Sequence, residues 1–246
     1  ETLVGSQIEA LLERGIIEAT DTADVYRFRH TLMRDAAYET QVLDDRIRTH
    51  AGVAEAVTAR GGEPALIAEH LDRAGQRDRA VTTYIVAAQQ EQSHGAHIEA
   101  NRLLTRALDL MEEMPESEER DLIELTGRML RGLSVSSMRG YAAPEVQFDH
   151  RRAETLATRL GNRPEVLPSL IAIWAYWLTS GNLSAAEGLI ERLTAMVEDP
   201  AYAWFEPEVE GCAGWVAFYR GEHAAAATHL TRAMDGFAGR GPDEKV

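Results

Sequence analysis

The spacing of apolar residues predicts a helix, a short hairpin and a second helix at the start of the chain. Residues 2–14 carry Leu and Ile side chains on one helical face, and Gly15 follows as a natural helix end. Residues 16–20 and 25–30 favour strands, the second with alternating apolar and polar positions, and a polar turn separates them. Thr31 is placed to cap the helix that follows.

The rest of the chain shows only helical spacing, interrupted by short turns rich in Gly and Pro. Helix, hairpin and helix is the order found at the end of a winged-helix module, which we place at residues 1–42. We assign residues 43–76 to bridging helices and residues 77–246 to an array of degenerate helical repeats. The predicted fold class is all-α: a tetratricopeptide-like helical-hairpin superhelix preceded by the end of a winged-helix module with a short β-hairpin.

A repeat is clearest near the end of the chain. Gly181 and Gly221 lie 40 residues apart, Ala186 and Ala226 each follow five residues later, and a large apolar residue comes four residues after each alanine. The same alternation of small and large residues recurs over residues 100–107. This order is typical of the second helix of a tetratricopeptide repeat, where small residues let two helices approach closely.

The composition is that of a globular chain with a strongly acidic surface. The 246 residues are 45% hydrophobic and carry a net charge of −15. Because such a surface repels phosphate backbones, we do not expect nucleic acid as a partner. No apolar run approaches the roughly 18 residues of a membrane span, and the single cysteine, Cys212, permits no internal disulfide. We therefore expect a cytoplasmic protein that has no membrane partner.

The chain lacks the motifs of the common catalytic sites. It contains no GxSxG sequence and no GxxxxGK sequence followed by Ser or Thr, and its one lysine is Lys245. The histidines follow no metal-ligand spacing, and Cys212 is the sole thiol. We therefore expect no enzyme activity, no metal and no cofactor in this chain itself.

Four segments, taken in order, carry a family resemblance. They are YRFRHTLMRDAAYETQVLDDRIRTHAGVAEAV, ALIAEHLDRAGQRDRAVTTYIVAAQ, RGYAAPEVQFDHRRAETLATRLG and GCAGWVAFYRGEHAAAATHLTRAM. Together they resemble the region that follows the ATPase domain in bacterial signal-transduction ATPases of the STAND class, which carry a nucleotidyl cyclase domain or a LuxR-type DNA-binding module. The resemblance implies a regulatory arm of a larger chain that binds ATP or ADP elsewhere. Its partner would be a protein, a peptide or the upstream ATPase domain.

The same resemblance implies a nucleotide role for one histidine. In STAND relatives, the winged-helix part carries a Met-His-Asp motif whose histidine contacts the phosphates of bound ADP. The matching triplet here is Arg29-His30-Thr31, which keeps the histidine and lacks the Met and the Asp. His30 is therefore the expected ADP-phosphate sensor of the intact parent. The alternative is that His30 ends the hairpin and bonds a nearby carbonyl group.

The aromatic residues indicate a second candidate site. All four tryptophans lie within residues 174–215. We interpret Trp174, Trp177, Trp215 and Phe218 as a partner groove, because repeat arrays curve and aromatic side chains often anchor a partner on the concave face. The alternative is that these rings pack against each other in the core of the last helix pairs.

Two classes of function follow from the sequence. The first is a non-catalytic regulatory and protein-interaction arm of an ATP-dependent signalling or transcriptional regulator. The second is a stand-alone tetratricopeptide adaptor that binds a partner peptide and has no nucleotide role. The helix and hairpin of residues 1–42 favour the first, because an adaptor has no use for half of a winged-helix module.

Overall fold

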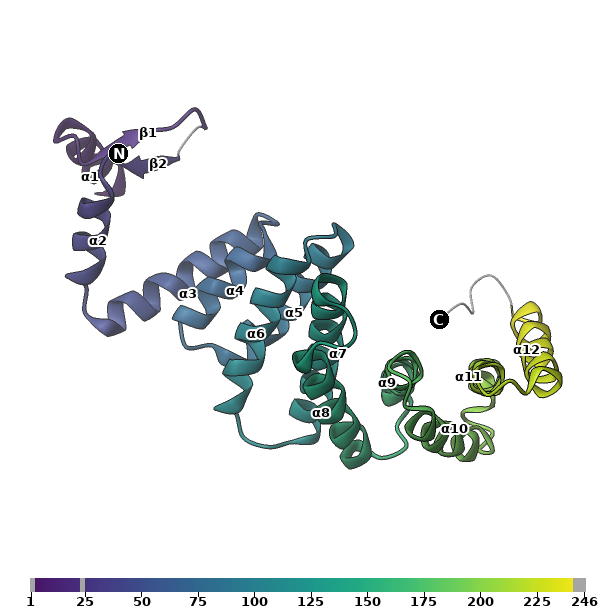
Figure 1. Ribbon diagram of the computed structural model, residues 1–246. Helices are drawn as coiled ribbons and strands as arrows, with labels where there is room; N and C mark the ends of the chain where they lie inside the picture. The colour runs from purple at the N-terminus through teal and green to yellow at the C-terminus, as the bar shows by residue number, and fades with distance from the viewer. Residues whose placement is uncertain (1–2, 23–24, 241–246) are drawn as a thin grey trace.

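The computed structural model describes residues 3–22 and 25–240 and confirms the predicted fold class. Helices follow one another as antiparallel hairpins that stack into a curved array (Figure 1). In chain order, the helices and strands are α1 (Leu3–Glu13), β1 (Ile17–Ala19), β2 (Tyr26–Phe28), α2 (Thr31–Glu39), α3 (Leu43–Ala59), α4 (Pro64–Arg73), α5 (Arg77–Ser93), α6 (His97–Glu112), α7 (Glu118–Arg139), α8 (Pro144–Leu160), α9 (Leu167–Thr179), α10 (Leu183–Val197), α11 (Glu206–Tyr219) and α12 (His223–Ala238). Short 3₁₀ turns lie before α9 and before α11, at Pro164–Val166 and Ala203–Phe205.

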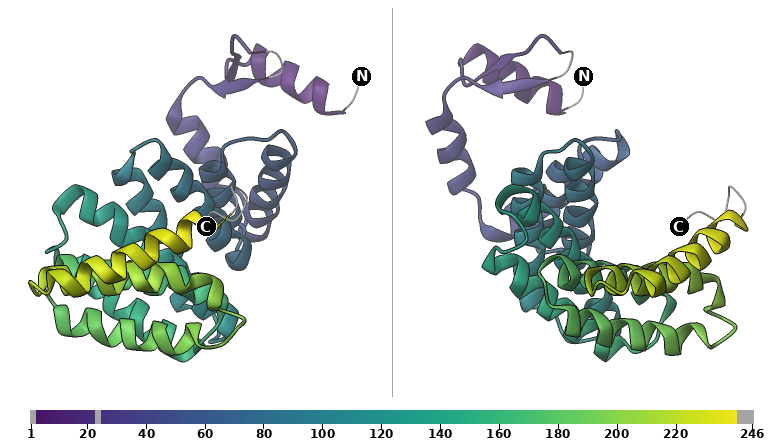
Figure 2. Two further views of the ribbon diagram at one scale, coloured as in Figure 1. Left: turned by 90° about the vertical axis from the view of Figure 1, so that its right-hand side faces the viewer. Right: turned by 45° about the vertical axis from the view of Figure 1, so that its right-hand side comes forward.

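The N-terminal elements form a small unit that projects from the array (Figure 2). β1 and β2 pair antiparallel, with Ile17 opposite Phe28, as the sequence predicts. The predicted cap of the next helix is wrong by one residue, because His30 is the N-cap of α2 and Thr31 is its first helical residue. None of the side chains of α2 is buried. Near the end of α2, Tyr38 contacts His50 and Arg46 of α3, which joins the unit to the array.

The helices assigned to a bridge pack as part of the array. Ala54 of α3 and Leu71 of α4 are buried in the same hydrophobic cluster as Val81 of α5 and Leu104 of α6. Packing therefore shows no boundary at residue 76, and the superhelix of the described chain begins with α3. The last six residues of the predicted array, 241–246, lie outside the described residues.

The small residues of the predicted repeat lie where neighbouring helices pack closely. Ala186 and Ala226 are buried, as the small positions of the repeat require. Between α11 and α12, a Cβ atom on Gly214 would lie only 2.7 Å from Cγ of Leu230, so only glycine permits this close approach. Small residues at these crossings let neighbouring helices come near enough to bury their larger side chains.

The turn between α11 and α12 explains the repeated glycine. Gly221 adopts a φ of 80°, a left-handed conformation that side chains with a Cβ atom rarely adopt. Its amide donates to the carbonyl of Phe218, and the amide of Glu222 donates to the carbonyl of Ala217, which closes the end of α11. Gly181 ends α9 with a φ of 81° in the same way, so the two glycines of the repeat occupy equivalent positions.

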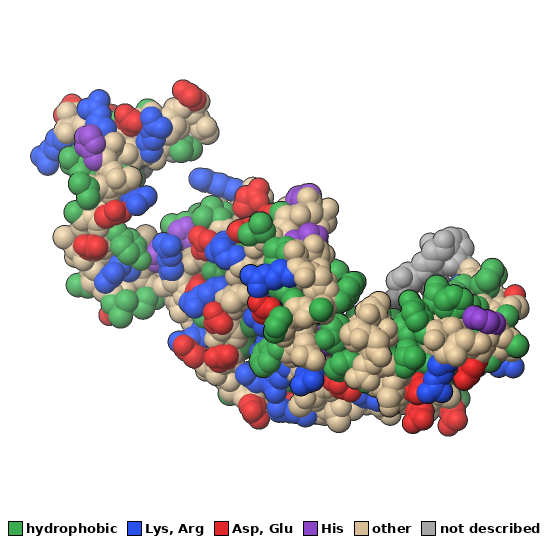
Figure 3. All heavy atoms as spheres, viewed as in Figure 1, with side chains coloured by type: hydrophobic (Ala, Val, Ile, Leu, Met, Phe, Trp, Pro, Cys, Tyr) green, Lys and Arg blue, Asp and Glu red, His purple; other side chains and the backbone are tan. Residues whose placement is uncertain are grey.

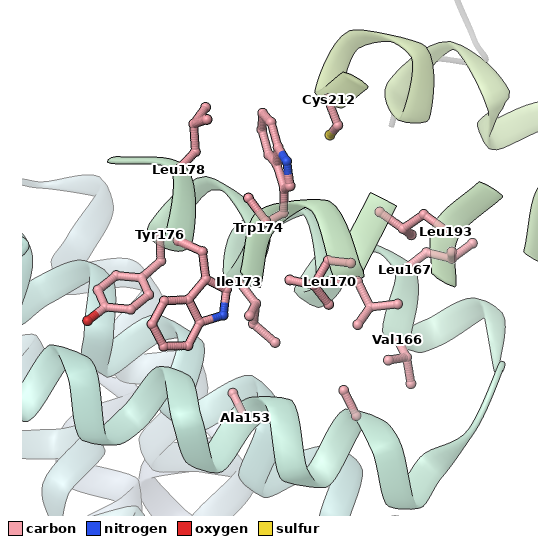
Figure 4. Packing of buried hydrophobic residues seen from close by; sticks show 14 of the residues in the cluster. Ala153, Val166, Leu167, Leu170, Ile173, Trp174, Tyr176, Leu178, Leu193 and Cys212 are labelled. Atoms are coloured by element: carbon pink, nitrogen blue, oxygen red, sulfur yellow. The ribbon is translucent and has the colours of Figure 1, made fainter. Parts of the chain in front are cut away.

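A second hydrophobic cluster fills the C-terminal half of the array. α9 lies between α8 and the later helices (Figure 1). From α9, Ile173 and Leu170 point toward Ala153 of α8, whereas Trp174 points toward Cys212 of α11 (Figure 4). α9 is thus covered on more than one face, which fits its almost wholly apolar sequence.

Candidate functional site

The structure separates the four residues predicted to line one groove. Trp174 and Trp177 are only 7% and 6% exposed and belong to the core around α9. Trp215 and Phe218 are 47% and 49% exposed on α11. The groove prediction is therefore wrong for the first two residues, because neighbouring helices enclose α9 and leave those rings no open face.

The exposed aromatic residues of α11 form a continuous surface. The rings of Trp215 and Phe218 meet edge to face at 5.9 Å, and Phe218 meets Tyr219 in the same way at 5.9 Å. His223, at the start of α12, lies 5.8 Å from Phe218. We call these four residues the α11 aromatic surface. Hydrophobic side chains gather over the C-terminal helices in the space-filling view (Figure 3). The predicted groove did not include Tyr219 or His223, although both lie within five residues of Phe218 in the sequence.

An exposed aromatic surface of this kind is suited to binding a protein segment. Large rings supply contact area with few rotatable bonds, and aromatic residues are enriched among the residues that dominate binding energy. Trp215 keeps about half of its side chain accessible although its neighbours already touch it. The surface is therefore preformed and loses little side-chain freedom when a partner binds.

His30 lies far along the chain from that surface, on the N-terminal unit. Its side chain is exposed and makes no capping hydrogen bond, while its carbonyl oxygen accepts from the amides of Met33 and Arg34. Next to it, Arg27 and Arg29 both approach Glu18 on β1. An exposed imidazole at the N-terminus of a helix is accessible to an anion. Its role as ADP-phosphate sensor stays a prediction for the intact parent.

A buried ion-pair network joins α7 to α8 and was not predicted from the sequence. The carboxylate of Asp149 is 0% exposed and accepts hydrogen bonds from Arg131 at 2.6 and 2.8 Å and from Arg128 at 3.1 Å. Glu124 accepts from Arg128 and, at 2.8 Å, from Arg152. Burial would raise the pKa of Glu124, but the two arginines hold it below its ordinary value. The network therefore stays charged and fixes α8 against α7.

A chain of hydrogen bonds links the N-terminal unit to the array. The hydroxyl group of Tyr38 lies 3.0 Å from Nε2 of His50, and Nδ1 of His50 lies 2.8 Å from Nδ1 of His70. Tyr38 belongs to α2, His50 to α3 and His70 to α4. Each bond needs one donor and one acceptor, so the chain forms while at most one of the two imidazoles is protonated, and protonation of both breaks the bond between them.

This joint is expected to weaken as the pH falls. Burial lowers the pKa of His50 below its ordinary value of 6.5, and His70 and Arg73 lower it further. Burial and Arg73 also lower the pKa of His70, against the opposing charge of Glu69. The unfolded chain thus takes up protons at higher pH than the folded chain, so stability is full above pH 6.5 and declines below it.

Thermal unfolding between about pH 7.5 and about pH 5.5 measures this effect. The wild-type midpoint should decline with falling pH, and His70→Gln should reduce the decline because it removes one titrating member of the pair. His94→Gln, at an exposed position, is the matched control and should leave the wild-type pH dependence in place. An equal decline in the wild-type protein and in His70→Gln would contradict the assignment.

The described residues contain no helix long and apolar enough to cross a membrane. Within the same residues, no group of three or more His, Cys, Asp or Glu side chains is arranged to hold a metal ion.

Comparison with known proteins finds a sequence relative and a solved structure with a similar fold. No family model matches the chain. Over 205 residues, 80% of this chain, it is 26% identical to an uncharacterized protein of Rhizobium meliloti (strain 1021), and the match spans 20% of that protein's length. Its fold is similar to the crystal structure of BtubC (BKLC) from P. vanneervenii, with a TM-score of 0.59 over 100% of this chain and 96% of that chain. At 17% identity, this likeness shows the fold alone.

Proposed function

We propose that this chain is a non-catalytic protein-interaction arm of a larger ATP-dependent signalling or transcriptional regulator. In this proposal, the α11 aromatic surface binds a protein partner, and the N-terminal unit connects the array to the nucleotide-binding part of the parent. The observation that carries the proposal is the exposed, preformed cluster of Trp215, Phe218 and Tyr219 on a curved helical-repeat array.

The link to a larger regulator has two supports besides the sequence resemblance. The chain spans about a fifth of the curated relative that it matches, as a part of a larger protein would. The N-terminal unit also exposes apolar side chains of Tyr26, Phe28 and Leu32, which suits a unit that packs against another domain. The alternative, a stand-alone adaptor, explains the aromatic surface equally well but gives this apolar unit no role.

Partner binding is tested at the α11 aromatic surface. A photo-crosslinking phenylalanine analogue at position 218, in the protein expressed in its native cells, identifies the protein that contacts this surface. The purified partner is then titrated with the wild-type chain and with the double variant Trp215→Ala, Phe218→Ala. Loss of two central aromatic anchors, at about 2 kcal/mol each, should weaken binding by roughly a hundredfold or more.

The control is Phe148→Ala, which removes an equally exposed ring from α8. It should leave affinity within about twofold of wild type, because α8 lies outside the proposed contact. Wild-type affinity in the double variant would contradict the proposal, and so would an equal loss in Phe148→Ala.

A further inference from the structure

A hydrophobic cavity of about 340 Å³ lies between α7, α8 and α9, away from the α11 aromatic surface. Met129 and Leu133 of α7 line one side, and Ala172 and Tyr176 of α9 line the other. Tyr141, in the turn between α7 and α8, is exposed beside it. The volume falls in the range of small-molecule binding sites, roughly 300 to 1,000 Å³.

His150 of α8 supplies the imidazole of this largely apolar cavity, whose other polar lining groups are the hydroxyl groups of Ser136, Tyr141, Tyr176 and Thr179. The imidazole is buried and stacks on the ring of Tyr176, with ring centres 4.0 Å apart and an angle of 23° between the planes. A Cβ atom on Gly132 would lie 2.9 Å from Cε1 of His150, so glycine at this position lets α7 close over the edge of the ring. Stacking and close packing together fix the orientation of the imidazole.

The hydrogen bonding of His150 determines its tautomer. Nδ1 lies 2.8 Å from the carbonyl oxygen of Val146, which can only accept, so Nδ1 carries the proton. Burial lowers the pKa of His150 below 6.5, against the raising effects of the Val146 carbonyl and Asp149. The ring is therefore neutral near pH 7, and Nε2 has no hydrogen-bond partner among the described residues. The cavity thus offers one fixed acceptor on an apolar wall.

The walls of the cavity are held in place from outside. Asp149, the neighbour of His150 in the sequence, binds Arg128 and Arg131 of α7. These buried ion pairs hold α7 against α8 next to His150. A cavity with such a supporting shell keeps its shape when empty, which lowers the free-energy cost of filling it.

A hollow between the start of α5 and the end of α6 has a different character. It is lined by Arg77, Asp78, Arg79 and Glu113, whose charged groups already pair or face water. An apolar molecule gains little in such a place, because it would displace water from charged groups. The His150 cavity, by contrast, combines a largely apolar lining with an imidazole acceptor that has no partner among the described residues.

We propose that the His150 cavity binds a small, flat, uncharged molecule that is mostly apolar and carries one hydrogen-bond donor. The donor bonds to Nε2 of His150, and the apolar rest fills the space between α7 and α9. The site shares no residue with the α11 aromatic surface, so a small-molecule effector and a protein partner would bind at separate sites of the array.

Indole is the probe, because it is flat and uncharged and has one N–H donor. Indene has the same shape without the donor. Titration of the purified chain, followed by calorimetry and by the ligand's own NMR signals, should show saturable binding of indole at one site. Indene should bind about three- to tenfold more weakly, since it lacks one hydrogen bond. Indole should also shift the imidazole signal of His150 and leave that of the exposed His94 in place.

Two variants block the cavity from different positions. Ala172→Leu places a larger side chain in the cavity from the middle of α9. Thr179→Leu does so from the end of the same helix, and because Thr179 is exposed, this change should have little effect on folding. Each should weaken indole binding by roughly tenfold or more. Ala225→Leu, an equal change in volume at an exposed position of α12, is the matched control and should bind indole as the wild type does.

The proposal holds if indole saturates one site, indene is weaker, and the blocking variants lose affinity. It is overturned if indole does not saturate up to its solubility limit, or if Thr179→Leu binds indole as tightly as the wild-type chain. Equal binding of indole and indene would overturn the assigned role of His150. None of these results depends on whether the α11 aromatic surface binds a protein.

Discussion

Replacement of Asp149 by alanine is expected to lower the free energy of unfolding by about 3 to 5 kcal/mol. The carboxylate is fully buried and accepts three hydrogen bonds from the guanidinium groups of Arg128 and Arg131. Its removal takes from Arg131 the carboxylate that pairs with it, and leaves Arg128 paired with Glu124 alone among the described carboxylates. Breaking one side of a buried pair is costly because the remaining charge stays out of water.

Urea unfolding of the purified chain, followed by circular dichroism, measures this loss. Glu113→Ala is the matched control. Glu113 forms an ion pair with Arg77 at 2.6 Å, and both side chains are at least half exposed. That change should cost no more than about 1 kcal/mol. If Asp149→Ala were no more destabilising than Glu113→Ala, the network would not hold α8 against α7 as we describe.

Replacement of Trp177 by alanine is expected to cost about 3 to 5 kcal/mol of stability, whereas Trp215→Ala should cost about 1 kcal/mol or less. The first ring packs in the core around α9, and its removal leaves a cavity that the surrounding helices fill only in part. The second ring keeps about half of its surface in water, so less apolar area is lost.

Trp177→Phe refines this comparison. The indole Nε1 of Trp177 is buried without a hydrogen-bond partner among the described residues. Phenylalanine keeps much of the apolar volume and removes that polar group, so it should cost clearly less than alanine does. Urea unfolding of the three variants provides the test. Equal stability losses in Trp177→Ala and Trp215→Ala would contradict the separation of the two rings into core and surface.

Much of the fold could be predicted because its determinants are local. Gly221 and Gly181 sit where a left-handed residue must close a helix, and Ala186 and Ala226 sit where two helices cross closely. Both requirements restrict the residue type, so glycine and alanine recur in the sequence at a constant spacing of 40 residues. The helix boundaries were less predictable, since His30, which makes no side-chain capping bond, is the N-cap of α2 in place of Thr31.

The sites were harder to predict because they depend on contacts between distant segments. The α9 sequence is apolar almost all round, so its periodicity does not separate a groove-lining Trp174 from a buried one. Glu124 and Arg128 show helical spacing, but the third partner, Asp149, lies 21 residues beyond Arg128 and meets it only across two helices. The pairing of His50 with His70 likewise requires α3 to lie against α4.

The central claim, that this chain is an arm of a larger ATP-dependent regulator, is tested most directly on the native polypeptide. Antibodies against the array isolate the protein from its cells, and its intact mass and peptides are measured by mass spectrometry. The account predicts a polypeptide well above the 27.2 kDa of this chain, with a phosphate-binding GxxxxGK peptide upstream of His30 in the same chain. A native polypeptide close to 27.2 kDa, or a longer one without that peptide, would contradict it.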